Sequence, residues 1–92
     1  MGGTSSEFEA LLGREVVLDA ASLYVFLGKL VAIDHRYAIL EDADAHDLRD
    51  SSTNREMYVL ESRQHGIRAN RRRLLVQLDE IVSLSALDDV LD

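Results

Sequence analysis

No cysteine, proline or tryptophan occurs in this 92-residue sequence, and aromatic residues make up only 5% of it. The lack of cysteine excludes a disulfide framework and a thiolate metal site, and the lack of proline excludes a proline-rich ligand segment. The longest apolar stretch, residues 23–33, is interrupted by Gly28 and Lys29 and is too short to cross a bilayer. We therefore expect one folded domain over residues 1–92, without a membrane partner.

The amino-terminal residues also lack the features of a secretory signal, because they include neither a basic nor an apolar stretch. This predicts a soluble, cytoplasmic protein. Gly2 and Ser6 satisfy the loose pattern for N-myristoylation. A flexible start over residues 1–4 explains the same residues and is the favoured interpretation, since so short a pattern often occurs by chance.

Positive charge is scarce and unevenly placed. Ten basic residues stand against 17 acidic ones, for a net charge of −7, which argues against a general clamp on a polyanion. Residues 51–73 carry +4, between flanks of −6 and −5. The one basic run, Arg71, Arg72 and Arg73, is a candidate for phosphate contact, because guanidinium groups bind phosphates and carboxylates. The alternative is a solvated strand start that balances nearby acids.

The apolar pattern predicts a mainly β protein. A short helix over residues 5–12 is expected, because apolar residues share one helical face and Gly13 supplies a stop. The hydrophobic period then changes from that of a helix to that of strands. Five short strands favour a small, strongly bent barrel. The expected strands cover residues 14–19, 23–34, 36–43, 74–78 and 81–84.

An insertion over residues 44–73 separates the third and fourth expected strands. Thr53 followed by Glu56 is typical of a capping box, and Gly66 is typical of a helix end. These signals predict a helix over residues 54–65. The strand-like composition of residues 57–60 is the competing signal.

No group of residues predicts catalysis. The chain has no nucleophile elbow and no phosphate-binding glycine loop, and His35 and His65 are expected at the surface. His46 with Asp44 and Asp47 is a weak candidate for a divalent ion. A solvated acidic strand end, in which His46 makes local contacts, is favoured. We therefore expect no enzyme activity, cofactor, metal or small-molecule substrate.

Two separated motifs resemble those of the Sm-like (LSm) family. The first is Gly28-Lys29-Leu30 with Asp34 six residues after the glycine, followed by Leu40-Glu41-Asp42-Ala43. The second is the paired apolar segment at residues 74–84. The resemblance implies a five-stranded barrel with an amino-terminal helix. It also implies a homo-oligomeric ring, built by pairing strands of neighbouring subunits.

The family's uridine pocket is only partly matched. Its Asp corresponds to Asp34, but the Asn that recognises the base falls on Ala38 or Tyr37, and the Arg-Gly pair falls on Gln77-Leu78. Aromatic and guanidinium groups of the first turn can still stack on a base. The candidate base-binding residues are Asp34, His35, Arg36 and Tyr37. Together, the resemblance and this partly matched pocket imply a ring-forming Sm-like protein with altered RNA binding. The alternative is a structural oligomer or protein-interaction scaffold that binds no nucleic acid.

Overall fold

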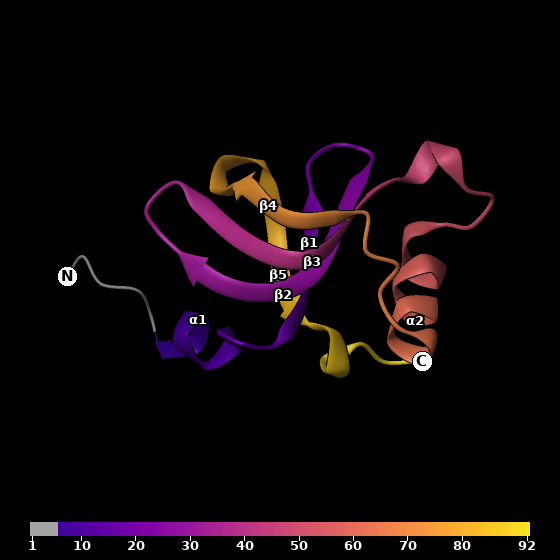
Figure 1. The fold of residues 1–92 in the computed structure, drawn as a ribbon. Coiled ribbons are helices and arrows are strands. Elements are labelled where there is room, and N and C mark those ends of the chain that lie inside the picture. Colours follow the sequence, from indigo (N-terminus) through magenta and orange to yellow (C-terminus); the bar gives the residue numbers. More distant parts are fainter. Residues whose placement is uncertain (1–5) are drawn as a thin grey trace.

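The computed structural model of this chain describes residues 6–92 (Figure 1). The expected flexible start at residues 1–4, and Gly2 of the lipidation pattern, lie outside these residues. The elements are α1 (Ser6–Leu11), β1 (Glu15–Ala20), β2 (Tyr24–Ile33), β3 (Tyr37–Asp47), α2 (Arg55–His65), β4 (Arg71–Gln77) and β5 (Ile81–Ala86). Single turns of 3₁₀ helix follow β3, β4 and β5, at Leu48–Asp50, Leu78–Glu80 and Leu87–Asp89.

The five strands form one strongly bent antiparallel sheet in the order β4-β3-β2-β1-β5. The short helix α1 lies at one end of the sheet and α2 at the other (Figure 1). This confirms the predicted fold class: five bent strands, an amino-terminal helix and a helix between the third and fourth strands. The order also leaves β4 and β5 as the two outer strands, because each is paired with one neighbour among the described residues.

The bend depends on a close contact between β2 and β3. Leu27 pairs with Asp44 and Lys29 pairs with Glu41, so Gly28 faces two residues instead of one. This is a β-bulge, and its Asp42 has a φ of 48°. A Cβ atom on Gly28 would lie 3.0 Å from the Cα of Ala43. Glycine therefore allows the two backbones to approach closely at the bend.

Two apolar clusters pack on opposite faces of the sheet. The inner cluster includes Val16, Leu18, Leu30 and Leu40, and Leu11 of α1 packs against it. In the outer cluster, residues of β1 and β2 that point away from the inner cluster pack against α2 and the turn after β5. The outer cluster consists of Val17, Val25, Leu27, Tyr58, Val59 and Leu87. The burial of both faces of β1 and β2 explains why the sequence is apolar on both sides of the long second strand.

The predicted helix over residues 54–65 is confirmed as α2, but its predicted cap is wrong. The side chain of Asn54, and not that of Thr53, accepts a hydrogen bond from the Met57 N–H, at 2.8 Å. The Thr53 hydroxyl lies 3.4 Å from the Ser51 hydroxyl instead. At the other end, Gly66 has a φ of 97° and closes the helix as expected.

The strands that flank the helix are longer than expected. β3 continues to Asp47 and β4 begins at Arg71, so residues 48–70 separate them, compared with the expected 44–73. Within residues 6–92, no helix has both the length and the apolar character needed to cross a membrane.

Candidate nucleic-acid interface

The turn between β2 and β3 is organised by the carboxylate of Asp34. Its Oδ1 atom accepts hydrogen bonds from the backbone N–H of Arg36, at 2.8 Å, and of Tyr37, at 2.7 Å. The N–H of Asp34 donates to the carbonyl of Tyr37, at 3.0 Å. The two hydrogen bonds to the carboxylate favour its charged form and hold the pKa of Asp34 below its usual value. Asp34 therefore stabilises the conformation of this turn.

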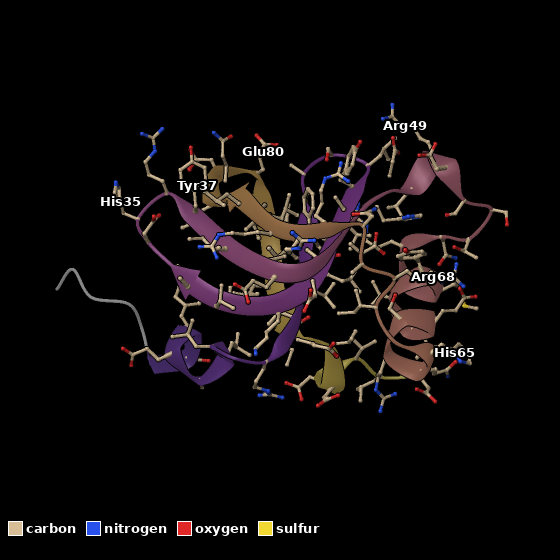
Figure 2. The ribbon with its side chains drawn as sticks, viewed as in Figure 1. His35, Tyr37, Arg49, His65, Arg68 and Glu80 are labelled. Atoms are coloured by element: carbon tan, nitrogen blue, oxygen red, sulfur yellow. The ribbon has the colours of Figure 1, made fainter. Side chains whose placement is uncertain are left out.

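The turn between β4 and β5 lies directly against this first turn. The Leu78 N–H donates to the carbonyl of Arg36, at 2.8 Å, and Tyr37 pairs with Gln77 across the two strands. His35, Tyr37 and Glu80 accordingly lie toward the same end of the sheet, away from α2 (Figure 2). The fold therefore brings the two sequence motifs, about 40 residues apart, into one surface.

The chemical groups on this surface are mixed. His35 and Arg36 are exposed and Tyr37 is half-buried, so all three lie where a base could stack. Ala38 is completely buried and offers no hydrogen-bonding side chain. The second turn contributes Gln77 and two exposed acids, Asp79 and Glu80, and no cation. The surface can stack on a base but offers little positive charge for the phosphates.

The basic run lies at the far end of β4. Arg73 and Arg71 precede Gln77 by four and six residues, which at about 3.3 Å per residue places them roughly 13 and 20 Å from the turn. Arg73 forms an ion pair with Glu41, at 3.2 Å, and Arg71 donates to the carbonyl of Asn70, at 3.0 Å. The structure therefore does not bring the two predicted sets of residues together.

Comparison with solved structures identifies the fold, although no protein-family model and no curated protein matches the sequence. An Sm protein from Pyrococcus abyssii, in complex with a uridine heptamer, has a TM-score of 0.61 and 16% identity over 88% of this chain and 93% of that one. A heptameric archaeal Sm protein has a TM-score of 0.59 and 16% identity over 89% and 97%. The chain has an Sm-like fold.

The same fold also occurs in a chain of a complex that is described with a bound peptide and CoA. A chain from the NatC complex bound to Gag peptide and CoA has a TM-score of 0.56 and 13% identity over 85% of this chain and 87% of that one. The two turns described above, at residues 34–37 and 78–80, lie within the two Sm-like motifs of this sequence. The likeness confirms the fold that the motifs predicted, and the chemistry of the surface is argued from the residues themselves.

The Sm-like sheet also carries a buried polar network that sequence reasoning missed. Asp44 is 2% exposed and accepts hydrogen bonds from the Tyr58 hydroxyl of α2 and from Asn70 Nδ2, the latter at 3.2 Å. The ring of His46 stacks on that of Tyr58 at 3.7 Å between centroids, and its Nε2 lies 3.2 Å from the Ser51 hydroxyl. The expectation of a solvated acidic strand end is therefore wrong, because α2 covers this part of β3.

The side chains that were considered for a metal ion have other partners in the structure. Asp47 forms an ion pair with Arg49, at 2.7 Å, and this contact lowers the pKa of Asp47 to about 2. Asp44 and His46 are engaged with Tyr58. In the described part of the chain, no three His, Asp or Glu side chains are grouped so that they could hold a metal ion.

Proposed function

We propose that this protein assembles into an Sm-like ring whose RNA binding is altered. The observation that carries the proposal is the pair of outer strands in one open sheet. The free backbone groups of such strands can pair with another chain, and closed pairing around a ring leaves no strand edge exposed. Leu75 on β4 is 52% exposed and Val82 on β5 is 71% exposed, so each edge also presents an apolar side chain. The heptameric Sm neighbour supports this arrangement.

The altered RNA binding follows from the groups on the two-turn surface. A neighbour of the same fold is described in complex with a uridine heptamer, and a base edge is read by polar groups whose good pairs contribute about 1–3 kcal/mol each. Here the buried methyl group of Ala38 and the phenol of Tyr37 stand where the family has its reading amide. Gln77 replaces the cation. Uridine-rich RNA should therefore bind weakly, through stacking.

Phosphate contact is the second component of the proposal. The net charge of −7 repels a polyanion. The three consecutive arginines at residues 71–73 form the densest positive charge in the sequence and could attract phosphates locally. Any RNA binding should therefore depend on these arginines and weaken steeply with added salt.

Fluorescence anisotropy with a short labelled oligouridine, in a series of salt concentrations, tests this proposal. Weak binding that decreases in the double variant Arg71→Ala with Arg73→Ala is expected. Lys29→Ala, which removes an exposed positive charge on β2, is the matched control and should change the affinity little. Tight binding that survives the double variant and disappears with Asp34→Ala would contradict the proposal. It would mean that RNA binds at the family's uridine pocket and not through the arginines.

The NatC neighbour favours a second function, a scaffold for protein interaction without nucleic acid. The two carboxylates of the second turn, Asp79 and Glu80, support it because they lie on the surface that would receive the RNA. A stable oligomer that shows no change in anisotropy with oligouridine, even at low salt, would favour the scaffold over the RNA-binding ring.

A further inference from the structure

The two outer strands are associated with opposite charges: β4 begins with positive residues, and negative residues follow the end of β5. The first three residues of β4, Arg71, Arg72 and Arg73, form what we name the basic run. The residues after β5 include Asp88, Asp89 and Asp92, which we name the acidic tail; all three are exposed. The basic run lies on one edge of the sheet and the acidic tail follows the opposite edge. A single copy therefore holds them on separate edges.

The direction of strand pairing decides whether these charges meet between copies. β4 has seven residues and β5 has six, so the two strands can pair along their whole length. If β4 of one copy runs antiparallel to β5 of the next, its first residues lie beside the last residues of β5, where the acidic tail begins. Every strand pair within the chain is antiparallel, and this pairing is slightly more stable per residue than the parallel one.

The faces of the two strands match as well. Leu74 and Val76 of β4 face the inner cluster, so the alternation places Arg73 and Leu75 on the outer face, where Arg73 pairs with Glu41. Arg71 pairs with Ala43, which belongs to the inner cluster. On β5, Leu84 packs against the inner cluster, so Ser83 and Ser85 point outward. A sheet that continues from copy to copy keeps its outer face aligned. Arg73 of one copy would therefore lie beside Ser85 of the next.

The surface beside Ser85 is suited to receive arginine side chains. It is a groove of about 570 Å³ between β1, α2 and the last residues of the chain, and Asp19, Glu56 and Asp92 are among its lining residues. Arg55 also lines the groove, but it is held by Asp19 at 3.4 Å and by the backbone carbonyl of Ser22 at 3.1 Å. Asp92 forms an exposed ion pair with Arg63, at 2.9 Å, so an incoming arginine would share this carboxylate. The groove thus combines carboxylates with apolar walls, which can cover the methylene stems of arginine.

We propose that the basic run of one copy binds the acidic tail and groove of the next copy, with Arg73 on the outer face. This inference rests on the proposed ring. It commits to a second copy of the chain as the partner of the basic run, because the charges and the strand faces agree with that partner. A carboxylate is already the partner of Arg73 within one copy, and the overall negative charge disfavours RNA.

Charge reversal tests the pairing. The full chain and its variants are studied by light scattering over a range of protein concentrations, at low and at high salt. We expect Arg71→Glu with Arg73→Glu to raise the concentration of half-assembly by roughly tenfold or more, since attraction becomes repulsion at every interface. Arg14→Glu with Lys29→Glu reverses two exposed cations that lie off both outer strands; it is the matched control and should shift this concentration by less than about threefold.

Rescue then identifies the partner surface. Asp88→Lys, Asp89→Lys and Asp92→Lys, added to the double glutamate variant, should restore assembly, because the charges become opposite again. Restoration by Asp79→Lys with Glu80→Lys instead would overturn the antiparallel pairing. Normal assembly of the double glutamate variant would overturn the proposed charge contact between copies. This conclusion would hold even if the same variant lost RNA binding, because RNA binding and assembly are measured separately. A wild-type chain that stays at 10.3 kDa would overturn the ring itself.

Discussion

Replacing Gly28 by alanine tests the physical basis of the bent sheet. The added Cβ would lie 3.0 Å from Ala43 Cα, 3.1 Å from Ala43 Cβ and 3.2 Å from the Glu41 carbonyl oxygen. Favourable contacts between carbon atoms lie at about 3.5–4.0 Å, so both contacts with Ala43 are too short. The contact with the Glu41 oxygen is also shorter than an ordinary van der Waals contact of a Cβ atom. Two of the three atoms belong to the backbone of β3, which is paired on both sides, so they cannot easily move away.

The expected cost follows from these contacts. Overpacking of this kind destabilises by about 1–3 kcal/mol. Alanine returns about 0.5–1 kcal/mol, because a glycine within a strand loses more conformational freedom on folding. We therefore expect Gly28→Ala to lower the free energy of unfolding by about 1–2 kcal/mol, measured by urea denaturation. In a domain of this size this corresponds to roughly 4–15 °C in Tm.

A second variant separates the close contact from other effects. Ala43→Gly removes one of the three contacting atoms, so the double variant with Gly28→Ala should be less destabilised than additivity of the two single variants requires. A Gly28→Ala protein that is as stable as the wild type would refute the reasoning, because β3 would then yield at no cost. Strict additivity in the double variant would also contradict it.

Three further predictions concern the helix cap, the turn and the buried network. Asn54→Ala should cost about 0.5–2 kcal/mol of stability and Thr53→Ala clearly less, by urea denaturation; equal costs would contradict the observed cap. Because the pKa of Asp34 is lowered by folding, its stabilising contribution is complete above its unfolded value near 3.8 and is lost as the pH falls through the lower folded value. The amide chemical shifts of Arg36 and Tyr37, whose N–H groups donate to Asp34, should therefore be constant above about pH 5 and change below it. Tyr58→Phe should cost about 1–3 kcal/mol, because it leaves one oxygen of buried Asp44 without a donor, and an unchanged stability would argue against that bond.

Much of the fold could be predicted because its signals are local. The stop at Gly13 and the helix end at Gly66 depend on a residue type that permits a positive φ, and the bend at Gly28 depends on a residue without a Cβ atom. The helix over residues 55–65 prevailed over the strand-like composition of residues 57–60, because a capping side chain precedes it and Gly66 ends it, although the cap is Asn54 and not the predicted Thr53. The alternation of apolar residues located the strands.

The rest depends on contacts between distant segments. The acidic residues at the end of β3 do not resemble a strand, and they are held in one because Asp44 and His46 contact Tyr58, which lies 14 and 12 residues further along the chain. The choice between Thr53 and Asn54 as a cap could not be made locally, since both residue types cap well. For the candidate site, the sequence located the first turn, but its contact with the second turn through Leu78 is visible only in the structure.

The molar mass of the chain in solution tests the central proposal most directly. Light scattering coupled to size exclusion, at micromolar to tens of micromolar protein, measures it without assuming a shape. The proposed ring predicts a single species at an integer multiple of 10.3 kDa that persists on moderate dilution. A species of 10.3 kDa at every concentration would contradict the proposal, because the edges of β4 and β5 would then remain unpaired between copies.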